Sequence, residues 1–374
     1  MNRDIIKKLI KYQALIFPFF LNCCSSGNQG GIIRKAEYAY VTNSNDSTIS
    51  MYKLDRTNGV LAPLSPATVS AGKNPYDMII DPQQKYAYVA DYGESAILVY
   101  KLNAYNGVLT NVIAKIATGN GPYNIIIDPA GKYAYVTNSN DNTISMYSVN
   151  KNTGMITPLN PPNIPTGNFP DIMRFDRSGK YLYATNSGDG TVSMYSVLTN
   201  GYLSSLTPAT VAAGNGADSI RFDISGKYAY VTNTNSNTIS MYQMDFNNGV
   251  LNALNPSKVY ANTPYSIQAY PLGKYLYAVN GYSNTISLYQ INANTGVLTL
   301  LNPSLISLKS GNPYEIVFDK SGKYAYILTS SNVILMYSVH EDGSLISLKP
   351  SEINTGNNPY AFVVYDPVLL PQVN

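Results

Sequence analysis

The sequence of 374 residues is dominated by a repeat built on the motif Tyr-x-Tyr. The first tyrosines of the copies are Tyr38, Tyr86, Tyr133, Tyr181, Tyr228, Tyr275 and Tyr324, so successive copies lie 47 to 49 residues apart. A fixed period of this length is typical of repeat architectures in which each repeat is one supersecondary unit. The repeat therefore restricts most of the chain to an array of seven similar units.

Each unit predicts four short β-strands. In one unit the first strand covers residues 122–128, the second begins at Tyr133, the third covers 143–147, and the fourth follows a turn that ends at Gly154. The strands are rich in β-branched and aromatic residues, and the turns between them carry Gly, Asn and Asp. This composition indicates antiparallel hairpins.

The two ends of the repeat array predict a closed ring. The array starts at a second strand, at Tyr38, and ends with an extra copy of the first strand at 359–365. Four strands per unit and a period near 48 residues are typical of propeller blades. We therefore expect an all-β, seven-bladed β-propeller of four-stranded blades over 35–367, followed by a tail at 368–374. Pairing of the C-terminal strand with the first blade closes the ring and removes its open edges.

The formal charge of +3 belongs to the N-terminus. Residues 1–22 hold four basic residues and one acidic residue, and the rest of the chain is neutral. The apolar run at 14–21 is too short to cross a bilayer, so we interpret 1–22 as a signal peptide. A neutral remainder gives no electrostatic basis for a nucleic-acid partner.

Both cysteines of the chain, Cys23 and Cys24, follow this segment. The segment resembles a bacterial lipoprotein signal, which implies lipidation at Cys23, with Cys24 as the alternative. Residues 23–34 would then form the anchor and a flexible Ser/Gly-rich tether. We expect export, lipid anchoring to the bacterial outer membrane on its periplasmic or exterior side, and a monomer. The alternative is an ordinary secretory signal with two incidental thiols.

One histidine and two cysteines exclude several kinds of chemistry. A His/Cys metal site and a Cys–His nucleophilic site both need more of these residues than the repeats contain. We therefore expect no metal and no cofactor.

Two repeat motifs resemble known propeller families. Tyr-Val-Thr-Asn, at 40–43, 135–138 and 230–233, resembles the repeat of the YVTN propellers of cell-surface proteins. Asn-Gly-Val-Leu, at 58–61 and 248–251, is similar to the seven-bladed lactonase family, which includes 6-phosphogluconolactonases. The resemblance covers 34–367.

In a propeller the first strand of each blade lines the central channel. The residues that begin these strands at the upper rim are Tyr76, Tyr123, Asp171, Asp218, Tyr265, Tyr314 and Tyr360. The second strands end at the same face with Asn43, Asp91, Asn138, Asn186, Asn233, Asn280 and Thr329. Phenols and amides suit a glycan or a protein loop. Alternatively, the Asn residues cap turns and the Tyr residues pack between blades.

The repeat is broken in one sector. Asp171 and Asp218 replace the rim tyrosine in two adjacent blades, and Arg174 and Arg221 replace an aliphatic residue on the same strands. The next blade has Gln268 at the arginine position. Charges at these positions are costly unless they are paired or functional, so the cluster is either a ligand site or an internal ion-pair network.

The lactonase resemblance implies Pro-Arg-His in the first strands and Asn-Glu after the second strands. The corresponding triplets here are Pro75-Tyr-Asp, Pro122-Tyr-Asn, Pro264-Tyr-Ser and Pro313-Tyr-Glu. The single histidine, His340, is expected on the lower face. The possible catalytic residues are Arg174 and Arg221 with Asp218 or Glu315 as a base, because a carboxylate base needs no histidine.

A second pattern lies in the turns between first and second strands, on the lower face. These turns carry Lys85, Lys132, Lys180, Lys227, Lys274 and Lys323. The predicted tether joins the ring at the same face, so we expect this face to turn toward an anionic bilayer.

The absent histidine set leads us to predict a non-enzymatic binding or adhesion scaffold that contacts a protein or glycan through its upper face. The alternatives are a lactonase that hydrolyses a sugar lactone and a structural envelope protein.

Overall fold

The computed structural model describes residues 37–309 and 311–365, and the chain divides into two units, Met1–Arg34 and Lys35–Asn374. The predicted signal peptide, the predicted lipidation site and the tail at 368–374 lie outside the described residues. Within them, 28 strands form seven antiparallel sheets of four strands. None of the described residues forms a helix that could span a membrane.

The strands, in chain order, are β1 (Glu37–Asn43), β2 (Thr48–Leu54), β3 (Leu61–Ser70), β4 (Pro75–Ile80), β5 (Tyr86–Asp91), β6 (Ala96–Leu102), β7 (Leu109–Ala117), β8 (Pro122–Ile127), β9 (Tyr133–Asn138), β10 (Thr143–Val149), β11 (Ile156–Pro165), β12 (Pro170–Phe175), β13 (Tyr181–Asn186), β14 (Thr191–Val197), β15 (Leu203–Ala212), β16 (Ala217–Phe222), β17 (Tyr228–Asn233), β18 (Thr238–Met244), β19 (Leu251–Tyr260), β20 (Pro264–Ala269), β21 (Tyr275–Asn280), β22 (Thr285–Ile291), β23 (Leu298–Ser307), β24 (Pro313–Phe318), β25 (Tyr324–Thr329), β26 (Val333–Val339), β27 (Leu345–Asn354) and β28 (Pro359–Tyr365).

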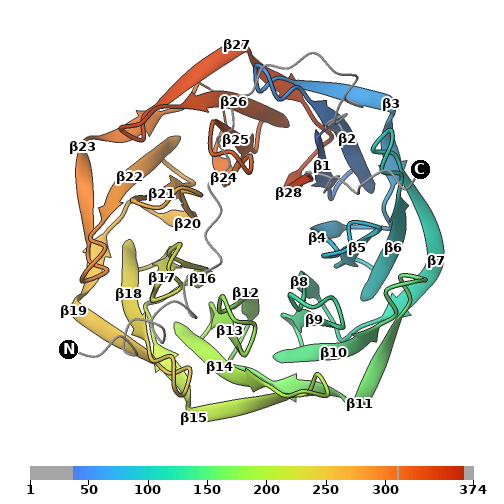
Figure 1. The fold of residues 1–374 in the computed structure, drawn as a ribbon, viewed down its shortest axis with the longest axis horizontal. Helices are drawn as coiled ribbons and strands as arrows, with labels where there is room; N and C mark the ends of the chain where they lie inside the picture. Colours follow the sequence, from blue (N-terminus) through green and yellow to red (C-terminus); the bar gives the residue numbers. More distant parts are fainter. Residues whose placement is uncertain (1–36, 310, 366–374) are drawn as a thin grey trace, which may run out of the picture. The chain divides into compact units, whose positions relative to one another are not determined.

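The seven sheets are arranged as blades around a ring (Figure 1). Six blades use four consecutive strands, and the first combines β28 with β1, β2 and β3. The pairing of β28 with β1, which aligns Tyr365 with Tyr38, closes the ring. The predicted seven-bladed propeller and its closure are therefore confirmed.

The two tyrosines of each repeat join neighbouring blades. The hydroxyl of Tyr230, the second tyrosine in β17, donates to the carbonyl of Gly296 in the next blade at 2.8 Å. The equivalent tyrosine does the same in all seven blades, and Tyr326 reaches Gly59 from the last blade back to the first. The first tyrosine donates to a carbonyl in the same turn, as Tyr228 does to Asn294. This contact explains why the period of the sequence is so strict.

The turn that receives these tyrosines requires glycine. Gly296 has a positive φ of 73°, and a Cβ placed there would meet the ring of Tyr228 at 2.2 Å. A residue with a side chain would be strained by its backbone and would also collide with the ring.

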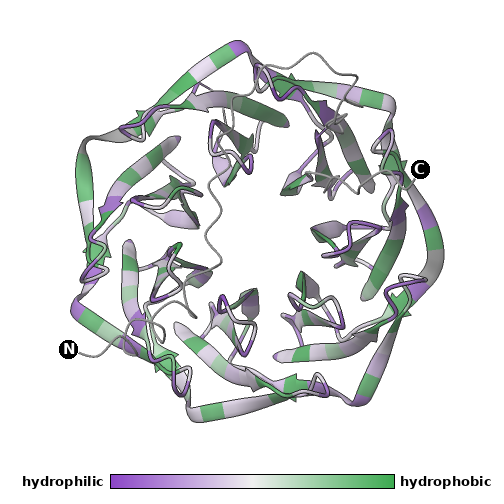
Figure 2. Ribbon diagram, in the orientation of Figure 1, coloured by the Kyte–Doolittle hydropathy of each residue, from purple (hydrophilic) through white to green (hydrophobic). Residues whose placement is uncertain are grey.

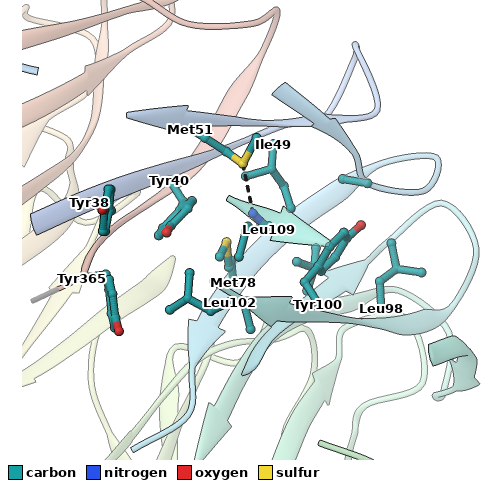
Figure 3. Close-up of a cluster of buried hydrophobic side chains, with 13 residues drawn as sticks. Tyr38, Tyr40, Ile49, Met51, Met78, Leu98, Tyr100, Leu102, Leu109 and Tyr365 are labelled. Carbon is teal, nitrogen blue, oxygen red and sulfur yellow. Dashed lines mark hydrogen bonds between the residues drawn. The ribbon is translucent and has the colours of Figure 1, made fainter. Parts of the chain in front are cut away.

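The core lies between neighbouring blades, because each sheet packs its faces against the next. Figure 3 shows one such cluster, in which Tyr40, Met51 and Tyr100 are buried and the sulfur of Met51 accepts the N–H of Leu109. The outer strands alternate between green and purple along the perimeter of the ring (Figure 2). In β19, for example, Leu251 is buried and Asn252 is exposed, as expected for a half-solvated edge strand.

Candidate functional site

The upper ends of the inner strands surround a cavity of about 250 Å³ at the centre of the ring. All seven predicted rim residues line it: Tyr76, Tyr123, Asp171, Asp218, Tyr265, Tyr314 and Tyr360. The pairing of each inner strand with its neighbour shifts register near its first residues, as between Pro170 and Met173 in β12. Such irregularities re-aim side chains, and here they lie beside the cavity.

Two arginines from adjacent inner strands, Arg174 on β12 and Arg221 on β16, line the cavity below the rim aspartates. Nη1 of Arg174 donates to the carbonyl of Met173 at 2.7 Å. Arg221 donates from Nη1 to the carbonyl of Ile220 at 3.0 Å and from Nε to Oε1 of Gln268 at 2.7 Å. A guanidinium has five N–H donors, so most of those on each arginine remain for a ligand. The predicted grouping of Arg221 with Gln268 is thus a direct contact.

Burial shifts the titration of both arginines. It lowers the pKa of Arg174, and the nearby Asp77 and Glu315 carboxylates oppose this change. For Arg221, burial and then the charge of Arg174 lower the pKa to about 9. Two like charges that share a cavity destabilise each other until an anion joins them.

The carboxylates that raise the pKa of both arginines belong to Asp77 on β4 and Glu315 on β24. Both residues come from the other side of the ring. Oε2 of Glu315 accepts the N–H of Phe362 at 3.0 Å. Oδ2 of Asp77 accepts the N–H of Ile125 at 2.9 Å and Nδ2 of Asn124 at 2.5 Å. Burial raises the pKa of Asp77, and it raises that of Glu315 to about 7.

Asp77 was absent from the residues predicted for the site, and Glu315 was considered only as a possible base. Both occupy the repeat position after the rim residue, where other blades have Asn124, Ser219 or Ser266. Comparison of this position across the seven repeats would have found them. Asn124 shows a structural use of the same position, because its Oδ1 accepts the N–H of Met173 in the next inner strand at 2.8 Å.

Asp171 and Asp218 lie at the mouth of the cavity. The pKa of each is raised to about 7, mainly by burial, and for Asp171 the charge of Asp218 contributes to the increase. Within the described part of the chain, neither aspartate forms a direct ion pair with Arg174 or Arg221. The opposite charges therefore face one cavity without neutralising each other in contact.

Tyrosines form the rest of the mouth. Tyr360 stacks on Tyr76 with ring centroids 4.1 Å apart, and its hydroxyl lies 2.5 Å from that of Tyr123. On the other side, the hydroxyl of Tyr265 lies 3.1 Å from that of Tyr282. Asp171 and Asp218 put small side chains where the repeat has phenol rings, on the same strands that carry the two arginines.

The predicted ring of amides at the ends of the second strands is wrong. Asn43, Asn138, Asn186, Asn233 and Asn280 are fully buried. In each case Nδ2 donates to a Thr and a Ser hydroxyl on the third strand of the same blade, as Asn233 does to Thr238 and Ser240. They hold the turn between the second and third strands, which was the alternative interpretation. The amides that reach the cavity are those of Asn124 and Asn358.

Among the described residues, no group of three or more His, Cys, Asp or Glu side chains is placed to hold a metal ion. The side chains that line the cavity include two guanidinium groups, four carboxyl groups and several phenols.

A comparison with protein families matches the sequence to the description "Lactonase, 7-bladed beta-propeller" over residues 31–169 and 163–318. No curated protein matches the chain.

Several solved structures share the fold. A putative 6-phosphogluconolactonase from Bacteroides fragilis is 21% identical, with a TM-score of 0.77 over 88% of this chain and 98% of its own. A putative 6-phosphogluconolactonase from Bacteroides uniformis is also 21% identical, with a TM-score of 0.76 over 88% and 99%. The periplasmic gluconolactonase of Pseudomonas aeruginosa is 18% identical, with a TM-score of 0.76 over 89% and 99%.

These matches correct the functional prediction. We expected a non-enzymatic scaffold, chiefly because the repeats lack the acid–base residues typical of the lactonase family, and that expectation is wrong: the family match supports the lactonase alternative. The prediction gave the absence of the Pro-Arg-His and Asn-Glu motifs more weight than the charged residues of the cavity. The match extends over most of the chain and over most of the ring, and the protein belongs to the lactonase family of seven-bladed β-propellers.

Proposed function

We propose that this protein is a lactonase that hydrolyses a sugar lactone in the central cavity. One observation carries the proposal. Arg174 and Arg221 turn unused N–H donors into a cavity that also contains the carboxyl group of Glu315. Hydrolysis of an ester needs a base for water and donors for the oxyanion, and this arrangement offers both.

Glu315 is the proposed general base. Its Oε2 is held by the N–H of Phe362, which leaves Oε1 for a water molecule. A base whose pKa lies near 7 combines a large ionised fraction with useful proton affinity at neutral pH. The alternative base, Asp218, is held at the mouth by the hydroxyl of Thr234 and lies on the same strand as Arg221.

The proposed reaction adds one water to the lactone. Glu315 takes a proton from water as the water oxygen bonds to the lactone carbonyl carbon. The guanidinium groups of Arg174 and Arg221 stabilise the resulting oxyanion. The carbonyl then re-forms, the ring C–O bond breaks, and the leaving oxygen receives the proton held by Glu315. The product is the open hydroxy acid, whose carboxyl group ionises.

The mouth fits the hydroxyl groups of a sugar. Asp171 and Asp218 accept hydrogen bonds when ionised, and Tyr265 offers a ring face for the C–H groups of the substrate. The names of the related Bacteroides and Pseudomonas proteins, which refer to gluconolactones with and without a phosphate, support a substrate of this class.

The proposed place of action is outside the cytoplasm. The support is the predicted signal peptide and lipidation site at Cys23 or Cys24, together with the periplasmic location given in the name of the Pseudomonas relative.

The test measures proton release during hydrolysis of glucono-δ-lactone and of its 6-phosphate, after subtraction of spontaneous hydrolysis. We expect turnover of at least one, with a rate that rises as the pH passes through about 7 because the ionised carboxyl group is the base. Glu315→Gln should lower kcat by about 10²–10⁴-fold.

Glu352→Gln, on the exposed side of β27, is the matched control and should leave the rate unchanged. Full activity in the Glu315→Gln variant would remove Glu315 as the base, and loss in Asp218→Asn instead would assign that role to Asp218. No turnover of either lactone by the folded wild-type protein would overturn the proposed function.

A further inference from the structure

The lower face of the ring carries several large apolar side chains that are exposed to solvent. This face consists of the turns between first and second strands and the turns between third and fourth strands. Its exposed apolar residues are Tyr105, Met155, Leu198, Ile224, Phe246 and Leu272. Leu272 is 67% exposed and Phe246 is 60% exposed. Side chains this exposed contribute little to the core, and a gathering of them marks an interaction surface.

Three of these residues belong to one sector. The turn of Ile224 lies against the turn of Leu272. The contact is seen at Gly273, where an added Cβ would lie 3.0 Å from Cγ2 of Ile224. The carbonyl of Ile224 accepts a hydrogen bond from Arg177 at 2.6 Å. The turn of Phe246 is bound to the same blade as Arg177, because Tyr181 donates to the carbonyl of Asn247 at 3.2 Å. We call Ile224, Phe246 and Leu272 the apolar sector.

Basic side chains surround the apolar sector. Lys227 and Lys274 lie in the turns of Ile224 and Leu272, and Lys180 lies in the turn of Arg177. Lys180 and Lys274 are exposed. Lys227 and Lys274 extend over the rings of the tyrosines that follow them, with Nζ about 5 Å from the ring centroids.

The acidic residues of these turns are engaged with the backbone. Asp176 is buried, and its Oδ1 accepts the N–H of Tyr181 at 2.8 Å. Asp223 does the same for Tyr228 at 2.8 Å, and Asp245 for Asn247 at 2.9 Å. These three carboxylates therefore stabilise the turns of this sector.

The chain joins the ring at this face. β1 begins at Glu37, which pairs with Leu54 just before the lower turn at Asp55. Glu37 lies fourteen positions after Cys23, the predicted lipidation site. That length spans at most about 50 Å when extended.

We propose that the lower face docks on an anionic lipid bilayer. The apolar sector enters the interface between headgroups and acyl chains, and the surrounding lysines contact lipid phosphates. Apolar and aromatic tips with interspersed lysines are the combination that binds such interfaces. In this orientation the central cavity opens away from the bilayer toward its soluble substrate.

The experiment uses the full chain with Cys23→Ala and Cys24→Ala, so that acylation cannot contribute. It is sedimented with vesicles of phosphatidylcholine alone and with vesicles that contain equal parts of phosphatidylcholine and phosphatidylglycerol. We expect preferential binding to the vesicles that contain phosphatidylglycerol. Phe246→Ser with Leu272→Ser should lower the partition coefficient at least about tenfold, and Lys180→Gln with Lys274→Gln should reduce the preference for the anionic lipid.

The matched control is Phe169→Ser with Tyr260→Ser. These residues are similarly exposed, at 54% and 67%, and lie at the opposite ends of the strands. All variants should keep the thermal unfolding temperature of the parent. Equal binding by the control and the apolar-sector variant would overturn the proposal, as would absence of binding to the anionic vesicles. Neither result would affect the proposed lactonase activity, which is measured in the absence of lipid.

Discussion

The second strands and the inner strands of the ring contrast sharply in how far their residues vary. Every second strand keeps a buried tyrosine whose hydroxyl binds a glycine carbonyl of the next blade, as Tyr230 binds Gly296. The inner strands have Tyr or Asp at the rim position, and Ile, Val, Arg or Gln three residues later. A second-strand tyrosine of this kind touches two blades, so its loss loosens the ring, whereas the rim residues and the arginines of the inner strands line the cavity. Uniform positions of the repeat therefore support the fold, and varied positions are the source of function.

The largest expected effect is loss of a second-strand tyrosine. Tyr230→Ala should lower the free energy of unfolding by about 3–5 kcal/mol, because it empties a packed site and removes the contact with Gly296. Tyr230→Phe keeps the ring and should lose only about 1–2 kcal/mol. Denaturant unfolding measures both. Loss of turnover in Tyr230→Ala protein that remains folded would contradict the assignment of the second-strand tyrosines to stability alone.

A change on an inner strand should act in the opposite way. Arg174→Met should lower kcat for the lactone by about 10²–10³-fold, because a donor to the oxyanion is lost. Its melting temperature should stay the same or rise, because a buried guanidinium without a directly paired carboxylate is destabilising. Arg177→Met, on the exposed lower face, is the control for loss of an arginine. A large fall in stability for Arg174→Met with unchanged kcat would assign Arg174 to the fold instead.

The smallest expected effect is a pH dependence of stability that arises at the mouth. Burial raises the pKa of Asp171 and Asp218 to about 7, above the value of about 3.9 in an unfolded chain. Between these values the folded protein holds protons that the unfolded chain has lost, so its free energy of unfolding falls as the pH rises from 4 to 7. The double variant Asp171→Asn with Asp218→Asn should show a smaller fall in the free energy of unfolding between pH 4 and pH 7. The difference from the parent should be on the order of 1 kcal/mol, because water at the mouth of the cavity screens these charges.

Unfolding curves at several pH values measure this slope, and Glu352→Gln serves as the neutral control. An unchanged pH dependence in the double variant would mean that both aspartates are ionised from pH 4 to pH 7 in the folded protein. Burial would then not raise their pKa.

The site was partly predictable from the repeat. Asp171, Asp218, Arg174 and Arg221 break the repeat in adjacent units, and adjacent units are neighbours in a ring, so their proximity followed from the sequence. Asp77 and Glu315 were harder to find, because they lie in blades on the other side of the ring. Their electrostatic effect on the arginines depends on the diameter of the cavity, which the period of the repeat does not give.

The repeat in the sequence is sufficient to specify the fold. Seven blades follow from the period and the Tyr-x-Tyr motif, and ring closure follows from the extra first strand at the C-terminal end. This is possible because each repeat carries both the tyrosine and the glycine that join neighbouring blades. The repeat does not specify which polar residues face the cavity, because that depends on contacts in three dimensions. Asn233 and Asp218 are both polar residues at the upper ends of strands, yet Asn233 is buried against Thr238 and Ser240, while Asp218 lines the cavity. The physical reason is that hydrogen bonds within a blade can bury a polar side chain between its strands. The sequence of a single strand does not show whether such partners are in reach.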